Sequence, residues 1–247
     1  MKRLIGELED EDSVESILVS RNGKQVDVGL VNHFKLHKKI PNKWFDWVRK
    51  VNAPIVIIGQ DWGPYIVLLK FIEDYSIEKD SMFFSYDDFL FKTFSSRTEK
   101  FIIKAIQNTY EDTFKEEFPK RLWELFFFTM AVLFTRQGKH FRGNYNFDSE
   151  KSTELSFKYV SKQLDIVRPK IVVPLGNLAL RSVDKHYQLG INNQKISKLV
   201  EELRPKGYIQ KGQTYILPNF HPASHITPKI QLDIWKKIWQ LIRIEEY

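Results

Sequence analysis

Three short, β-branched apolar runs constrain this chain more than any other feature of its sequence. They occupy residues 54–59, 170–176 and 214–218. Each run is too short for a buried helix and ends in glycine or proline, and an amphipathic, helix-like pattern follows it. Runs that are apolar on both faces are typical of parallel strands that helices cover on each side. The pattern therefore predicts an α/β fold.

Helical patterns alternate with these strands, and a fourth strand is expected over residues 125–134. This alternation predicts a three-layer sandwich, with a central, mostly parallel four-stranded sheet flanked by helices. The last helix would have Thr227 as its N-cap and Pro228 at its first position. The expected helices cover residues 64–72, 97–110, 152–167, 177–187 and 227–244.

The chain shows no internal repeat and no linker rich in serine, glycine or proline. We therefore expect one α/β domain over residues 51–247, with residues 1–50 as an N-terminal extension packed on it. Within that extension, residues 14–31 could supply one or two strands. Residues 43–51 have the pattern of a short amphipathic helix.

Composition excludes several classes of site. The chain has no cysteine, which rules out disulfides, thiolate zinc sites and cysteine-ligated iron–sulfur clusters. Lysine and arginine exceed aspartate and glutamate by 38 to 31, and this mild excess suits a polyanionic partner without requiring one. There is neither an uncharged apolar run of about 18 residues nor the apolar core of a signal peptide. We expect a cytoplasmic protein with no membrane contact.

Polar and small residues gather where the predicted strands end, and ligands of open α/β sheets bind beyond the carboxyl ends of the strands. Asp61 lies two residues after the strand that ends at Gly59, and His221 lies three residues after the strand that ends at Pro218. Together they could serve hydrolysis, with the carboxylate orienting water and the imidazole acting as base or as hydrogen-bond donor. Taken singly, Asp61 could instead be a helix N-cap and His221 a structural histidine.

Other catalytic and cofactor signatures are missing from the sequence. It has no serine in a nucleophile elbow, no HExxH, no GxxxxGK[ST] and no GxGxxG. A serine triad, a metal site and a nucleotide-phosphate cradle are therefore not indicated. We expect no cofactor and no metal.

Three motifs resemble those of the uracil-DNA glycosylase superfamily, in the same order and on the expected strand ends. The first is Gly59-Gln-Asp-Trp-Gly63, the second is the strand-to-glycine segment 172–179, and the last is Phe220-His-Pro-Ala-Ser224. The resemblance extends over about residues 54–226. It implies an enzyme that flips a pyrimidine nucleotide out of DNA and cuts the bond between base and deoxyribose.

The resemblance also implies roles for individual residues. Asp61 would position the attacking water and offset positive charge on the sugar, and His221, as a neutral imidazole, would stabilise negative charge on the base O2. Phe94, with Phe84 as second choice, would stack on the flipped base. The expected base pocket consists of Gln60, Trp62, Gly63, Phe94 and Met130.

DNA contacts are implied at two further segments. Backbone amides of residues 176–177 and 222–225 would bind phosphates, and the residue four beyond the catalytic histidine would be the wedge. The expected DNA-binding residues are Gly176, Asn177, Ser224, His225 and Ile226. We expect a monomer that acts on DNA.

Two departures from the family pattern concern the substrate. Gly63 stands where the uracil-specific branch has a tyrosine that blocks the thymine methyl, and Met130 stands where the base-reading asparagine is usual. A thioether packs softly but cannot donate a hydrogen bond. The two changes predict a roomier, less polar pocket for a pyrimidine that is bulky at C5, such as a modified cytosine of phage DNA. Asn144 or Asn146 could restore a polar reader, and then uracil would remain the substrate.

Two other functions remain open. A non-catalytic protein of the same fold could hold DNA through N-terminal basic residues and aromatic stacking, and a hydrolase could act on free nucleosides instead. The basic residues concerned are Lys38, Lys39, Lys43, Arg49 and Lys50.

Overall fold

The computed structural model describes the centre of the α/β fold and parts of the N-terminal segment. The described residues are 3–4, 7, 17–21, 24–28, 30–32, 51–60, 70, 73–74, 97–136, 149–191, 194–222 and 228–242. All but one residue of each of the helices predicted over residues 64–72 and 43–51 lie outside this set.

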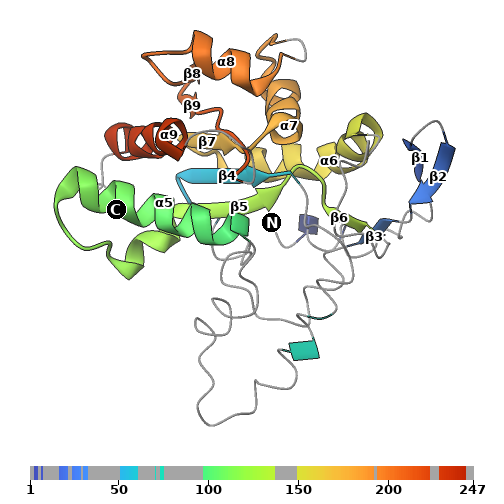
Figure 1. Ribbon diagram of the computed structural model, residues 1–247, viewed down its shortest axis with the longest axis horizontal. Helices are drawn as coiled ribbons and strands as arrows, with labels where there is room; N and C mark the ends of the chain where they lie inside the picture. Colours follow the sequence, from blue (N-terminus) through green and yellow to red (C-terminus); the bar gives the residue numbers. More distant parts are fainter. Residues whose placement is uncertain are drawn as a thin grey trace.

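A five-stranded sheet forms the core of the described part of the chain (Figure 1). Its strand order is β5-β4-β7-β9-β8, and neighbouring strands are parallel except for β8, which runs antiparallel to β9. The mostly parallel α/β sheet is therefore confirmed, with one more strand than predicted. The strands are β4 (Ile55–Gly59), β5 (Phe126–Met130), β7 (Ile171–Pro174), β8 (Ile209–Lys211) and β9 (Thr214–Ile216).

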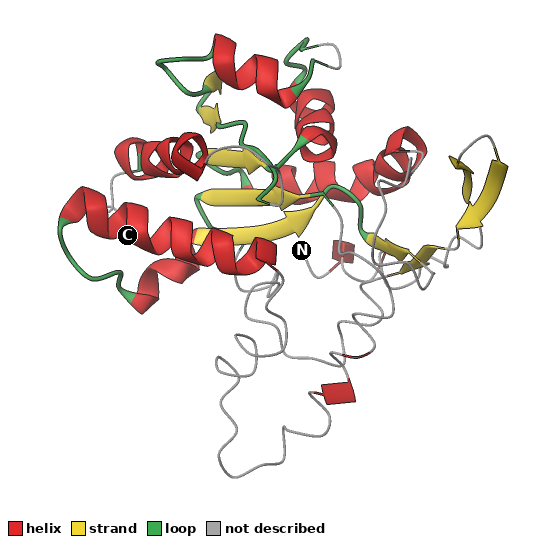
Figure 2. Cartoon of the chain, viewed as in Figure 1, coloured by secondary structure: helices red, strands yellow, loops and turns green. Residues whose placement is uncertain are grey.

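Helices cover both faces of the sheet and complete the predicted three layers (Figure 2). Helices α5 and α9 pack on one face, and α6 and α7 pack on the other. The helices are α5 (Arg97–Phe114), α6 (Ser149–Val167), α7 (Asn177–Tyr187), α8 (Ile196–Glu202) and α9 (Pro228–Leu241), with a short 3₁₀ helix, η2 (Lys120–Leu125). No helix within the described ranges is long and apolar enough to cross a membrane.

The alternation of side chains in β4 explains its uniform apolarity. Ile55 and Ile57 point into the core under α5 and α9, whereas Val56 and Ile58 point into the core under α6 and α7. All four are essentially inaccessible to water. Burying each such side chain contributes roughly 1.5–3 kcal/mol, so a strand between two helical layers is stabilised from both sides. This position fixes where the strand ends and the chain emerges.

The predicted fourth strand is shorter than expected. It ends at Met130, and residues 131–133 are buried without belonging to the sheet ladder. The chain then forms β6 (Phe134–Arg136), which pairs antiparallel with β3 (Leu30–Asn32) instead of extending the central sheet.

Among its described residues, the N-terminal segment forms three short strands, where one or two were expected. Strands β1 (Ile17–Arg21) and β2 (Lys24–Val28) form an antiparallel hairpin, and β3 follows. Leu4 lies buried in the core beneath α6 and α7. The domain boundary at residue 50 stays a prediction.

Candidate functional site

The carboxyl ends of the parallel strands bring together residues from four segments of the chain. In the strand register, Gly59 at the end of β4 lies opposite Met130 at the end of β5. Leu175, just after β7, forms an isolated parallel bridge with Asn219, just after β9. The four chain segments therefore leave the sheet at one edge, where polar residues were expected to converge.

Gly176 shows how closely these segments approach one another. A methyl group added to Gly176 would lie 3.1 Å from Nε2 of Gln60 and 3.3 Å from Cβ of His221. The φ angle of Gly176 is 88°, a left-handed conformation that glycine adopts without strain. The half-buried side chains of Gln60 and His221 thus both lie close to a position that favours glycine.

The thioether of Met130 lies against the backbone at the end of β4. A methyl group added to Gly59 would overlap Sδ of Met130 and lie 3.0 Å from its Cε. Beyond the register pair, the amide of Ala131 donates to the carbonyl of Gly59 at 2.9 Å, and that of Val132 donates to Gln60 at 3.0 Å. Met130 is therefore held beside the backbone at the point where β4 ends and Gln60 follows.

Asn219 organises the chain that leads into His221. Its amide donates to the carbonyl of Pro174 at 3.0 Å, and its carbonyl accepts from the amide of Gly176 at 2.9 Å. Its side-chain Oδ1 accepts from the amide of Phe220 at 2.8 Å. Phe220 is buried in the core under α5 and α9, so His221 follows two anchored residues.

The start of α7 also lies at this edge. Gly176 is the N-cap of α7, and the α7 N-terminus carries the positive end of the helix dipole. Asn177 is exposed, and its Oδ1 accepts from the amide of Ile196 at 2.9 Å, which ties α8 to the start of α7. Helix N-termini of this kind favour anions such as phosphate.

The structure brings five of the predicted site residues to one edge: Gln60, Met130, Gly176, Asn177 and His221. The other predicted site residues lie outside the described residues, so the meeting of Asp61 with His221 stays a prediction. These are Asp61, Trp62, Gly63, Phe94, Ser224, His225 and Ile226, together with the alternatives Phe84, Asn144 and Asn146.

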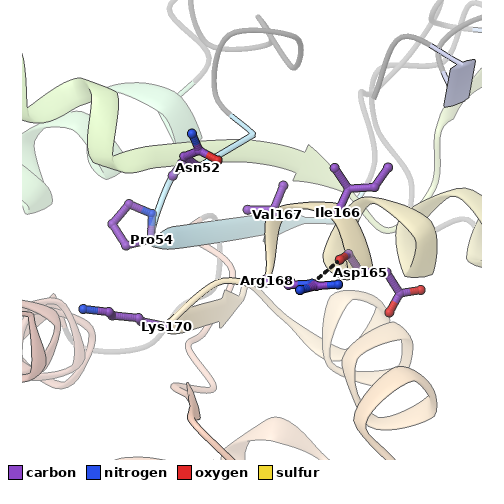
Figure 3. A pocket seen from close by; sticks show the side chains of 8 residues that line it. Asn52, Pro54, Asp165, Ile166, Val167, Arg168 and Lys170 are labelled. Carbon is purple, nitrogen blue, oxygen red and sulfur yellow. Dashed lines mark hydrogen bonds between the residues drawn. The ribbon is translucent and has the colours of Figure 1, made fainter.

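A separate hollow of about 630 Å³ lies at the opposite edge of the sheet (Figure 3). It opens beside the segments that lead into β4 and β7, and Nε of Arg168 there donates to the carbonyl of Asp165 at 3.3 Å. None of the predicted site residues lines it. The lining residues are Asn52, Ala53, Pro54, Asp165, Ile166, Val167, Arg168 and Lys170.

A second histidine lies between α6 and α7. The Ser161 hydroxyl is 2.8 Å from Nδ1 of His186, and Asp165 is 3.9 Å from its Nε2. Burial lowers the pKa of His186 below its usual value, and the nearby Asp165 carboxylate partly opposes this effect. Ser161 lies in the middle of a helix, away from any strand-to-helix elbow, so this set acts as a link between two helices.

Across the part of the chain that the structure describes, no three histidine, aspartate or glutamate side chains gather closely enough to hold a metal ion.

The sequence matches the model of one known protein superfamily. A family model described as the uracil DNA glycosylase superfamily matches residues 45–243 of the 247. The matched range contains the whole central sheet and all three motifs. Proteins of this superfamily are generally DNA glycosylases. No curated protein shows significant sequence similarity to this chain.

Proposed function

Because the chain belongs to the uracil-DNA glycosylase superfamily, we propose that it is an active DNA glycosylase. The reaction would hydrolyse the N-glycosidic bond of a flipped pyrimidine nucleotide and leave an abasic site in the DNA. The observation that carries this proposal is that side-chain atoms of Gln60 and His221 both lie close to Gly176. This supports a ligand site because both residues follow strands at the edge where α/β sheets bind their ligands.

The chemistry needs two opposite charges stabilised at once. As the bond breaks, the sugar becomes positive and the departing base becomes negative. A fixed imidazole at His221 would donate a hydrogen bond to the base oxygen. Such a bond stabilises the transition state most when the donor is already oriented before the reaction. Asp61 follows Gln60 directly in the sequence. Its carboxylate would orient the water and offset the charge of the sugar.

We propose a base that is bulky at C5 as the substrate. The support is Met130, whose sulfur lies against Gly59 at the carboxyl edge of the sheet and offers no donor for a carbonyl of the base. Gly63 adds no side chain to block a C5 substituent. A modified cytosine fits both features, and a defensive role against phage DNA in the cytoplasm would account for such a substrate.

Phosphate binding would complete the site. The N-terminus of α7 at Gly176 and Asn177 offers backbone amides and a favourable dipole to a DNA phosphate. The chain's net charge of +7 acts in the same direction.

The test is base release from oligonucleotides, single- and double-stranded, that carry uracil, a thymine mismatch, hydroxymethylcytosine or glucosylated hydroxymethylcytosine. We expect abasic sites with the bulky bases, and a loss of about 10²–10⁴-fold in rate for Asp61→Asn and for His221→Ala. Retained DNA binding by the double variant would show that only chemistry was lost. Salt-sensitive binding without release of any base would instead indicate a non-catalytic DNA-binding protein.

Met130→Asn tests the substrate preference separately. An asparagine amide both donates and accepts, so it can read the polar edge of uracil. We expect the ratio of uracil to bulky-base release to rise by about 10-fold or more, since an unmatched polar group costs large factors in discrimination. Met130→Leu keeps the apolar volume and should keep the wild-type ratio. Strong uracil release by the wild type, without preference for large C5 groups, would contradict the bulky-base substrate.

A further inference from the structure

Asn219 is a polar residue in a place where the fold buries apolar ones. Its side chain is 0% exposed, between the buried residues Pro218 and Phe220 and two positions before His221. Burying a carboxamide is unfavourable unless its hydrogen bonds are replaced within the protein. The bonds that Asn219 makes therefore indicate why it is present.

Those bonds join three segments of the site. The backbone of Asn219 bonds Pro174 and Gly176, which continues the pairing between β7 and the β9 segment beyond the end of the ladder. The side-chain Oδ1 then accepts from the amide of Phe220, which is the first peptide group after the paired region. The carboxamide thus fixes the turn by which the chain enters His221.

Stability alone does not explain the choice of asparagine. Within the described part of the chain, the Nδ2 group of Asn219 is buried and has no hydrogen-bond partner. An unmet buried donor costs free energy, so the Nδ2 group offsets part of what the Oδ1 bond to the Phe220 amide contributes. A buried polar atom left unpaired in a native structure calls for a specific explanation.

The residues around His221 restrict the position of its side chain. Its Cβ lies only 3.3 Å from where a methyl group on Gly176 would be, and Nε2 of Gln60 lies 3.1 Å from the same point. We therefore expect a change in the orientation of the Phe220 peptide to displace the imidazole of His221, because these close neighbours leave the side chain little space to adjust.

We propose that the Asn219 carboxamide is a positioning residue for His221. Its Oδ1 bond to the Phe220 amide orients the turn, and the turn places the imidazole for base release. The inference rests on the proposed function, because His221 acts on the base only if the protein is a glycosylase. Asn219 itself touches no reacting atom and acts through His221.

The first measurement is independent of activity. In NMR spectra, the imidazole signals of His221, identified by their loss in His221→Gln, report the surroundings of the ring. We expect Asn219→Ala to shift these signals. Asn219→Asp keeps an acceptor oxygen within reach of the Phe220 amide and should bring the signals back toward their wild-type positions.

The second measurement is the single-turnover rate of base release. A misplacement of about 1 Å can cost on the order of 100-fold in rate, so we expect Asn219→Ala to lower the rate by about 10- to 100-fold. Affinity for DNA should change by less than about 3-fold, since the phosphate contacts remain. Asn219→Asp should recover part of the rate.

Gln163 on α6 provides the matched control. It is also a buried carboxamide, 1% exposed, and neither of its side-chain polar atoms has a hydrogen-bond partner within the described residues. Gln163→Ala should leave the His221 signals and the rate unchanged, whatever it does to the melting temperature. Equal effects of Gln163→Ala and Asn219→Ala would overturn the proposal, because the change would then reflect stability alone.

The outcomes separate the two proposals. If the wild type releases no base, the glycosylase function fails, yet the NMR signals still decide whether Asn219 positions the ring. If the wild type is active and Asn219→Ala leaves both rate and signals unchanged, the positioning role is wrong and the function stands. Should Asn219→Ala not fold, unaltered His221 signals in Asn219→Leu, which also lacks the acceptor, would overturn the inference.

Discussion

Gly176 is the residue on which the approach of Gln60 and His221 depends most directly. It combines a left-handed backbone with two close side-chain neighbours, so a side chain there would meet two separate obstacles. The first is backbone strain, which costs about 1–3 kcal/mol for a non-glycine residue. The second is displacement of the proposed catalytic imidazole.

Gly176→Ala separates these two effects when it is compared with Gly190→Ala. Gly190 also has a positive φ, 73°, but a methyl group added there would meet nothing within 4 Å. We expect both variants to lower the melting temperature, and only Gly176→Ala to slow base release, by about 10-fold or more. Thermal unfolding and single-turnover assays measure the two effects. Equal activity in the two variants would show that the spacing at Gly176 does not matter for catalysis.

At the scale of single residues, the motifs led to Gly176 and His221 but not to Asn219. Gly176 ends a β-branched run, and His221 is followed by proline, so both have a local signal. Asn219 resembles any polar turn residue in the sequence. Its importance depends on hydrogen bonds to Pro174 and Gly176, which are distant in the chain and meet only in the folded sheet.

At the scale of elements, apolarity predicted burial better than it predicted strands. Strands β4, β7 and β9 were found from their runs, and α7 has the predicted bounds of 177–187. Strand β8 was missed because its residues are half-buried or exposed and it depends on pairing with β9. Residues 131–133 were included in a strand because they are apolar, yet they are buried off the ladder, where the amide of Leu133 donates to Ser156.

The link between α6 and α7 makes stability depend on pH. Burial holds the pKa of His186 below 6.5, so the folded state favours the neutral ring, whose Nδ1 can accept from Ser161. As pH falls below the unfolded-state pKa, the unfolded chain binds the proton first and the folded state loses stability. The stabilising effect is therefore fully present above about pH 6.5 and decreases below it.

His186→Phe should remove this dependence. At about pH 7.5 the variant should be less stable by about 1 kcal/mol, since the hydrogen bond to Ser161 is lost. Toward about pH 5 the difference from wild type should shrink, because only the wild type is penalised by protonation. Urea unfolding at both pH values measures this. Ser161→Ala keeps the buried ring and should keep the pH dependence. A difference in unfolding free energy between wild type and His186→Phe that stays the same at both pH values would show that His186 is not the source of the pH dependence.

At the scale of the whole molecule, the proposed site and the hollow lie at opposite edges of the sheet. The carboxyl edge of the sheet carries Gln60, Met130, Gly176 and His221, whereas the hollow in Figure 3 lies at the amino edge. The net charge of +7 attracts a polyanion such as DNA. This attraction makes the affinity for DNA depend on salt concentration.

DNA affinity should therefore weaken as salt is raised. Neutralising about four phosphates gives on the order of a 100-fold loss of affinity for a fourfold rise in salt concentration. We expect a loss of about 10- to 100-fold in equilibrium titrations with a duplex, while the single-turnover rate at saturating DNA stays unchanged. Activity on free nucleosides that exceeds activity on DNA and ignores salt would favour a nucleoside hydrolase instead.

The pairing of β3 with β6 has a consequence for shortened versions of the protein. The family match begins at residue 45, but β3 lies before that point and provides the backbone partner of residues 134–136. A recombinant fragment trimmed to the matched range would expose an unpaired strand edge just beyond β5, and such edges promote association between chains. The fragment would also lose Leu4 from the interior and the ion pair of Glu7 with Lys162. Recombinant versions of the protein should therefore retain the N-terminal residues through β3, although the family match does not include them.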